Sequence, residues 1–349
     1  MSLKSRVLHA ALSGALALSG LFVCTQAQET AIPFYEGKQL SIIIGSSIGG
    51  GYDAYARLLG RHLGEHLPGN PTIVLQNMPG AGSNKAAAYI YGVAPKDGTV
   101  MAAIFSGAIL EPLLGDKPVP HDPSKFNYVG SANNEFFLCV ARSDAAVKSF
   151  KDTLALPLTL AASAEGGSTR DFPTLLNNVL GTKFHVVTGY PGSREEILAV
   201  EQGEAQGQCG LGWSSLNTLR PDWIPTGKVR ILAQEALKGH PAVTKMGVPL
   251  TLDFAKTEAD RQVLELVYSQ EVFGRPFVLP PGVPADRVAT LRQAFMETLR
   301  DPDLLADAKK NLLDVDPISG EEVQALVAKA YATPQRIVAR ARRALAYLP

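Results

Sequence analysis

The stretch that decides the fold is LSIIIGSSIGGGYDAYAR, residues 40–57. It begins with a short, mostly apolar run that is typical of a buried strand. Three consecutive glycines follow, Gly49, Gly50 and Gly51, and they let the backbone turn tightly and approach a bound molecule. Asp53 is a good N-cap for the helix predicted after them. A strand, a glycine turn and a helix N-terminus form an anion site, because free N–H groups and the helix dipole point the same way.

The N-terminus, residues 1–27, has the pattern of an export signal. Lys4 and Arg6 supply its positive start, an apolar segment follows, and a small-x-small cleavage site ends at Ala27. The apolar segment is too short for a comfortable membrane span. We therefore expect an exported, periplasmic protein that begins directly after this segment. Acylation of Cys24, which would make the chain a lipoprotein, is the alternative.

Charge and cysteine content exclude several classes of partner. The 33 basic and 33 acidic residues cancel, and no basic cluster stands out, so we expect neither nucleic acid nor an anionic membrane surface as partner. Two cysteines remain after processing, Cys139 and Cys209. An oxidising compartment permits a disulfide between them, but we expect two buried free thiols. Neither cysteine has a second ligand at metal-binding spacing, so we expect no metal and no cofactor.

Strand and helix signals alternate twice, once before and once after the apolar run at 136–140. Such alternation predicts right-handed parallel β–α–β units in each half. Two α/β lobes with their glycine turns facing one cleft follow, since ligands in open α/β sheets lie beyond the carboxyl ends of strands. We expect residues 28–136 and 235–349 in lobe 1 and residues 137–234 in lobe 2. The C-terminal third is mostly helical, with a capping box at Ser319.

Six glycine-containing motifs occur in order along the mature chain. They are GGGYDAYAR (49–57), QNMPGAG (76–82), APKDGT (94–99), SAEGGS (163–168), VVTGYPGS (186–193) and FVLPPGVP (277–284). Each motif alone is weak evidence for a protein family, but six of them in order behind an export signal are specific evidence. On these motifs the chain resembles the extracytoplasmic substrate-binding receptors of tripartite tricarboxylate transporters, the Bug family. The likeness covers nearly all of the mature chain.

The resemblance implies a type II periplasmic-binding-protein fold, with two α/β lobes joined by a hinge and the ligand in the cleft. It implies a receptor and not an enzyme, which captures a small carboxylate and delivers it to the membrane components of the transporter. Such receptors commonly hold carboxylates through backbone N–H groups and ordered water, with few charged side chains. We expect the protein to be a monomer with no catalytic residues.

The ligand is expected at the glycine turns of both lobes. The candidate contacts are Ser47, Gly49, Gly50, Gly51, Tyr52, Asp53, Ser106, Gly107, Ser163, Gly167, Ser168, Thr169 and Tyr190. Several have a simpler structural explanation. Asp53 is first of all a helix cap, Ser106 and Gly107 also suit a turn, and Ser168 and Thr169 also suit a helix start.

Two positions depart from the family pattern, so the sequence does not decide which carboxylate binds. Gln206 stands where an acidic residue is common, and Tyr52 is bulky where a small hydroxyl residue is usual. An aromatic carboxylate stacked on Tyr52 or Tyr190 is therefore an alternative to a simple dicarboxylate. Arg170 and Arg194 are interpreted as residues of a solvated face, with contact to an anion as the alternative.

A secreted α/β-hydrolase (an esterase) is the rival hypothesis. Gly45-Ser-Ser47-Ile-Gly49 matches the Gly-x-Ser-x-Gly nucleophile elbow, with His240 or His185 as the base. However, the elbow would lie on the first strand, which leaves no room upstream for the strands and oxyanion loop of that fold. A dinucleotide-binding enzyme fits worse, because the glycines lack the G-x-G-x-x-G spacing.

Overall fold

The computed structural model describes residues 33–115 and 117–346, whose strands form two separate sheets. The export signal predicted for residues 1–27 lies outside the described residues. Within them, none of the helices has the length and hydropathy that crossing a membrane requires. Both sheets belong to the same compact unit, Pro33–Pro349. The α/β fold class that the alternating signals predicted is confirmed.

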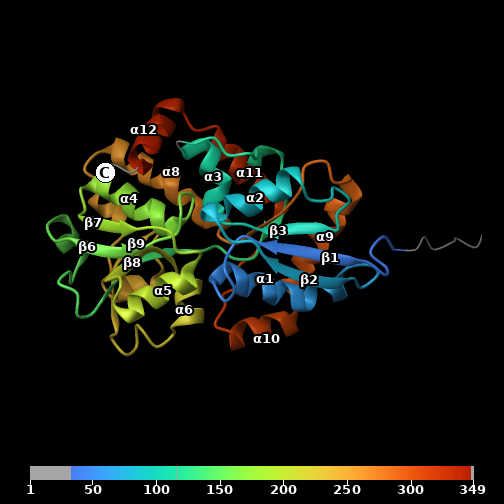
Figure 1. Cartoon of the computed structure of the whole chain (residues 1–349), viewed down its shortest axis with the longest axis horizontal. Coiled ribbons are helices and arrows are strands. Elements are labelled where there is room, and N and C mark those ends of the chain that lie inside the picture. Colours follow the sequence, from blue (N-terminus) through green and yellow to red (C-terminus); the bar gives the residue numbers. More distant parts are fainter. Residues whose placement is uncertain (1–32, 116, 347–349) are drawn as a thin grey trace, which may run out of the picture. The chain divides into compact units, whose positions relative to one another are not determined.

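The first sheet has the strand order β11-β4-β10-β3-β1-β2 within the described chain, and Figure 1 labels its strands β1, β2 and β3. The strands are β1 (Gln39–Ile44), β2 (Thr72–Asn77), β3 (Val100–Ala103), β4 (Asn127–Ser131), β10 (Pro276–Leu279) and β11 (Ile318–Ser319). β1 pairs in parallel with both β2 and β3, whereas β10 and β11 pair antiparallel to their neighbours. Ile44 lies opposite Asn77 and Ala103, so three carboxyl ends meet at one edge.

The second sheet has the order β7-β6-β8-β5-β9 within the described chain. Its strands are β5 (Phe137–Arg142), β6 (Leu158–Ala161), β7 (Phe184–Val187), β8 (Gly207–Gly212) and β9 (Val229–Glu235). β6 pairs in parallel with β7 and β8, and β5 pairs antiparallel with β8 and β9. Each sheet thus combines parallel β–α–β strands with antiparallel strands.

Helices follow most of the strands. The α-helices are α1 (Gly51–His62), α2 (Asn84–Gly92), α3 (Ser106–Leu114), α4 (Ser168–Leu180), α5 (Ser193–Gln202), α6 (Trp213–Leu219), α7 (Pro241–Lys245), α8 (Glu258–Tyr268), α9 (Ala285–Thr298), α10 (Pro302–Lys310), α11 (Gly320–Tyr331) and α12 (Gln335–Leu345). Short 3₁₀ helices cover Leu63–His66, Ala81–Ser83, Pro123–Lys125, Phe150–Leu154, Thr251–Phe254 and Ser269–Phe273. α1 and α9 pack on the first sheet through a core that includes Ile42, Leu59 and Phe295. The capping box predicted at Ser319 is confirmed at the start of α11.

The chain crosses between the sheets twice, between β4 and β5 and again between β9 and β10. The two crossing segments are hydrogen-bonded to each other. The Ala132 amide donates to the Arg275 carbonyl at 3.0 Å, and the Glu135 amide donates to the Glu271 carbonyl at 3.0 Å. This places Glu135 and Arg275 at the junction of the two sheets.

Candidate functional site: a pocket at the helix N-termini

A pocket of about 480 Å³, part of it open to solvent, lies where loops of both sheets meet. Its lining among the described residues is Ser46, Tyr52, Phe105, Ser106, Gly107, Phe137, Ser163, Ser168, Thr169, Gly192, Ser193, Glu196, Gly210, Leu211, Gly212, Ser215, Gln270 and Arg275. Most of these residues follow the carboxyl ends of β1, β3, β6, β7 and β8. This is where ligands of open α/β sheets bind.

The helices α1, α3, α4 and α5 all begin at this pocket. Their N-caps are Gly50, Phe105, Gly167 and Gly192, and none of these described caps bonds its helix through a side chain. The short helix α6 also begins here, after Gly212. The first N–H groups of a helix have no partner inside it and carry partial positive charge. The pocket is therefore surrounded by groups that favour an anion.

Asp53 differs from its predicted role. Gly50 is the N-cap of α1, and Asp53 lies inside the first turn. The Asp53 carboxylate is 1% exposed and accepts hydrogen bonds from the Gly49 amide at 2.7 Å, Arg57 Nε at 2.8 Å and Asn77 Nδ2 at 2.8 Å. These partners fix the loop after β1 in place. A ligand contact by Asp53 stays a prediction, and Asp53 is absent from the described pocket lining.

The glycine loop after β1 contacts the start of α5. Ser47 Oγ donates to Glu195 Oε2 at 2.7 Å, and the Gly51 amide donates to Ser193 Oγ at 3.4 Å. The Gly49 amide bonds Asp53, and the Gly50 amide donates to the Ser47 carbonyl at 3.4 Å, so all three glycine amides already have protein partners. The loop thus joins the first sheet to the second, and a direct ligand contact by these amides stays a prediction.

The loops of the two sheets also contact each other at Gly82 and Gly107. A Cβ at Gly107 would lie 1.9 Å from the Gly166 carbonyl oxygen, and one at Gly82 would lie 2.0 Å from the Glu165 carbonyl oxygen. Only residues without a side chain fit at such distances. The loops of the two sheets therefore meet backbone to backbone at this junction.

A buried ion pair whose arginine, Arg275, lines the pocket escaped the sequence analysis. Arg275 Nη2 donates to Glu135 Oε2 and to Ser214 Oγ, and the Tyr52 ring centroid lies 4.2 Å from the guanidinium carbon. Arg275 and Glu135 are each 2% exposed. Their charges balance each other, so this pair does not by itself give the pocket a net charge. The available sequence signal was a lone cation directly before the apolar strand β10.

Glu196 is a second lining residue that the sequence analysis missed. Thr169 Oγ1 donates to Glu196 Oε1 at 2.8 Å, and Gln208 Nε2 donates to Glu196 Oε2. Burial raises the pKa of Glu196 to about 8, because the charged form loses its hydration. The available signal was an acidic residue next to the glycine turn at Gly192.

The predicted candidates fall into two groups. Those that line the described pocket are Tyr52, Ser106, Gly107, Ser163, Ser168 and Thr169. Those that are not part of this lining are Ser47, Gly49, Gly50, Gly51, Asp53, Gly167 and Tyr190. Gly167 is the N-cap of α4, which begins at Ser168. The Tyr190 hydroxyl instead donates to Glu204 Oε2 at 3.4 Å.

The sequence analysis also singled out Arg170, Arg194 and Gln206. Arg170 is 8% exposed and donates to the Leu345 carbonyl at 2.9 Å, so the prediction of a solvated face is wrong for it. Arg194 is exposed, as predicted. The Gln206 side chain accepts a hydrogen bond from the Thr159 amide at 3.0 Å, which ties β8 to β6.

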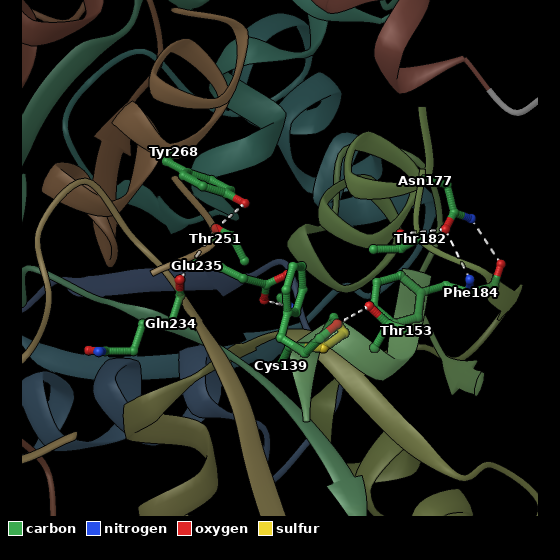
Figure 2. The surroundings of a disulfide bond; sticks show 12 residues. Cys139, Thr153, Asn177, Thr182, Phe184, Gln234, Glu235, Thr251 and Tyr268 are labelled. Atoms are coloured by element: carbon green, nitrogen blue, oxygen red, sulfur yellow. Dashed lines mark hydrogen bonds between the residues drawn. A yellow bond between two sulfur atoms is a disulfide. The ribbon is translucent and has the colours of Figure 1, made fainter. Parts of the chain in front are cut away.

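Cys139 and Cys209 form a disulfide, so the prediction of two free thiols is wrong. They lie on the neighbouring strands β5 and β8, and both are fully buried. Figure 2 shows Glu235 beside this disulfide; Glu235 accepts a hydrogen bond from the Gly210 amide, and burial raises its pKa to about 8. The sulfur atoms and the Glu235 carboxylate lie within 4.8 Å of one another, but a disulfide sulfur is no thiolate ligand for a metal.

The geometry does not support the hydrolase hypothesis. The Ser47 hydroxyl bonds Glu195 and not a histidine. The His240 ring stacks on Phe136, with ring centroids 4.5 Å apart. A nucleophile elbow requires the serine to be hydrogen-bonded to its base, with the base oriented by a third group.

Comparisons with known proteins give the same fold. No protein-family model and no curated protein matches the sequence, but solved structures do. The periplasmic binding protein BugD has 19% identity and a TM-score of 0.70, covering 89% of this chain and 98% of that one. An R. palustris protein with adipate has 20% identity and a TM-score of 0.68, covering 87% and 97%.

A third similar structure is MatC from Rhodopseudomonas palustris with bound malate. It has 20% identity and a TM-score of 0.65, covering 88% of this chain and 99% of that one. One of these neighbours, BugD, bears the name of the family that the six glycine motifs indicated. The chain has the fold of the periplasmic binding proteins, BugD among them.

Proposed function

We propose that this chain is an extracytoplasmic solute-binding receptor. It captures a small carboxylate between a lobe made of residues 28–136 and 235–349 and a lobe made of residues 137–234. It then delivers this ligand to the membrane components of a tripartite tricarboxylate-type transporter. The proposal includes export through the N-terminal signal and a monomeric protein without cofactor. The similar structures solved with adipate and malate support it.

The observation that carries the proposal is the convergence of helix N-termini on one pocket. The helices α1, α3, α4 and α5 each place a first-turn residue in the lining: Tyr52, Ser106, Ser168 and Ser193. None of the four N-cap side chains accepts a hydrogen bond from its own helix. Two of the first amides have another side-chain partner, because Gly51 donates to Ser193 Oγ and Ser106 donates to the Tyr52 hydroxyl. A carboxylate supplies the missing acceptor and the favourable charge.

The expected energies suffice for a useful affinity. One helix N-terminus contributes about 0.3–1 kcal/mol, and up to ~2 kcal/mol when partly buried. A hydrogen bond to a charged group contributes roughly 1.5–3 kcal/mol. Three or four such bonds together with the dipoles reach the ~8 kcal/mol of a micromolar complex. Because Glu135 balances Arg275, this sum does not rely on an arginine clamp.

The remaining lining favours a small ligand with an apolar part. Hydroxyl groups of Ser46, Ser163 and Ser215 can bond a second polar group, and Phe137 and Leu211 provide apolar surface. The Tyr52 ring already covers Arg275 and lies 4.5 Å from the Phe105 ring. A short aliphatic or hydroxylated carboxylate therefore fits these groups better than one that must stack on Tyr52.

The test is a binding screen on protein taken from the periplasm of an expression host. Intact mass should first show the loss of the first 27 residues, whereas an acylated Cys24 would make the chain a lipoprotein. Thermal shift and calorimetry then compare adipate, malate and benzoate with hexylamine. We expect at least one carboxylate to bind with a micromolar Kd, and stability to rise by about 2.7 kcal/mol at 100 times that Kd. Binding of hexylamine alone would overturn the proposal.

A further inference from the structure

Glu196 is the buried acid of the pocket that the proposed function does not yet use. It lies in the first turn of α5 and is 1% exposed. The start of α4 contacts it through Thr169, and β8 contacts it through Gln208. The carboxyl group is therefore held on two sides while it forms part of the pocket wall.

The hydrogen bonds around Glu196 leave room for one proton. Thr169 Oγ1 accepts from the Ser163 amide at 3.0 Å, so its own proton is free to go to Glu196 Oε1. Gln208 Oε1 is buried, and within the described chain it has no hydrogen-bond partner. A half-turn of the Gln208 amide exchanges its oxygen and nitrogen, and Oε1 then accepts a proton from Glu196 Oε2. The number of unpaired buried atoms is unchanged, so the network also accommodates the protonated acid.

The charged groups facing Glu196 also favour its neutral form. Glu195 on the same helix repels a charge on Glu196 and raises its pKa. Tyr190 precedes the helix and is no cation, and Arg275 across the pocket is already paired with Glu135. Burial adds the largest contribution and brings the pKa of Glu196 to about 8.

We infer that Glu196 takes part in recognition as a neutral carboxylic acid, so that an anionic ligand is bound together with one proton. This inference rests on the proposed function. An anion held at the helix N-termini and an ionised Glu196 would repel each other in the same pocket. The proton comes from solvent and resides on Glu196 Oε2. A neutral Glu196 thereby removes the charge repulsion that an anion at the helix N-termini would otherwise meet.

The first arm of the test measures calorimetric affinity for adipate, malate and benzoate between pH 6.5 and 9.5. For the wild type we expect a constant affinity well below pH 8 and a loss of about tenfold per unit above it, because one proton is taken up with the ligand. In Glu196→Gln this slope is lost, so the variant binds more tightly than the wild type at pH 9.5. Glu201→Gln, on the same helix but bonded to Arg220 outside the described pocket lining, keeps the wild-type slope.

A pH-independent wild-type affinity for a carboxylate that does bind would overturn the inference and leave the proposed function standing. A structural role for Glu196 alone would lower the affinity of Glu196→Gln at every pH, without making it the tighter binder at pH 9.5.

The second arm needs no ligand and therefore stands if none of the three carboxylates binds. Between the ordinary pKa of a glutamate and about 8, the folded state holds a proton on Glu196 that the unfolded state has released. The folded state binds more protons there, so this residue makes stability fall as pH rises from about 5 to 8. Denaturant unfolding should show that Glu196→Gln gains stability relative to the wild type over this range, whereas Glu201→Gln does not. Parallel curves for Glu196→Gln and the wild type would overturn the inference.

Discussion

Four helices that begin at the pocket differ from several helices elsewhere in how their first turn is capped. α8, α10 and α11 are capped by the side chains of Thr257, Asp301 and Ser319, which accept hydrogen bonds from backbone amides of the first turn. No described residue of these three helices lines the pocket. The helices α1, α3, α4 and α5, which do line it, have no such cap.

Absence of a cap alone does not mark a binding site. The described helices α9 and α12 also lack a side-chain cap, and their N-caps are Pro284 and Pro334. α2 lacks one because the Ser83 hydroxyl instead accepts a hydrogen bond from the Phe105 amide. What distinguishes the pocket is that several uncapped starts converge. A side-chain cap and a ligand compete for the same N–H groups, so helix starts that bind a ligand are expected to lack a side-chain cap.

The largest effect is expected where the loops of the two sheets meet. Gly107→Ala places a methyl group 1.9 Å from the Gly166 carbonyl oxygen, so the loops must separate and the converging helix starts move apart. We expect ligand affinity to fall by at least about 100-fold, which is ~2.7 kcal/mol. Calorimetry measures the loss, and small-angle scattering with ligand should show a larger radius of gyration than the wild type has.

Gly92→Ala is the control for this change. Gly92 is the last residue of α2, and a Cβ there has no described atom within 4 Å. Affinity should stay within about twofold, and stability should not fall, because alanine is the better helix former. Unchanged affinity in Gly107→Ala would show that binding does not require the close contact between Gly107 and Gly166. The site would then not depend on how the loops of the two sheets meet.

A side-chain cap added at the pocket should have the next largest effect. Gly50 has φ −74° and ψ 168°, which any residue adopts, and a Cβ there would be no closer than 3.3 Å to its neighbours. In Gly50→Asp the new carboxylate takes the N–H groups of α1 and repels an anion. We expect affinity to fall about tenfold while stability changes by only a few tenths of a kcal/mol.

Gly50→Asn separates the cap from its charge. Asparagine caps a helix as well as aspartate does but carries no charge, so its affinity should fall less, by about threefold. Equal losses for the two variants would mean that the ligand does not place its anionic group at this helix start.

The sequence predicted the architecture because the fold depends on local patterns. Apolar runs, glycine turns and helical spacing repeat within a few residues, and they identified the parallel strands and the capping box at Ser319. The same patterns did not show which of Gly49, Gly50 and Gly51 needs the backbone conformation that only glycine adopts easily. Gly49 is the one of Gly49 to Gly51 with a positive φ, at 83°, whereas Gly50 has ordinary angles.

The site was predicted only in part, because its remaining residues meet through tertiary contacts. Arg275 lies beside Tyr52 and Glu135 through the second crossing between the sheets, and no local spacing relates these three residues. The disulfide was missed for the same reason. Cys139 and Cys209 are 70 residues apart in sequence, and only the pairing of β5 with β8 brings them together.

The smallest effect on binding is expected from removing a cap far from the pocket. Ser319→Ala deletes the hydroxyl that accepts from the Glu322 amide at 3.3 Å and leaves the Glu322 carboxylate without the Ser319 hydroxyl that donates to it at 2.7 Å. Loss of such a cap costs about 1 kcal/mol of stability, which denaturant unfolding should detect. Affinity should stay within about twofold, because α11 contributes no described residue to the pocket. A tenfold loss of affinity in Ser319→Ala would mean that helix starts influence binding through overall stability, and the convergence of uncapped starts on the pocket would then no longer explain binding.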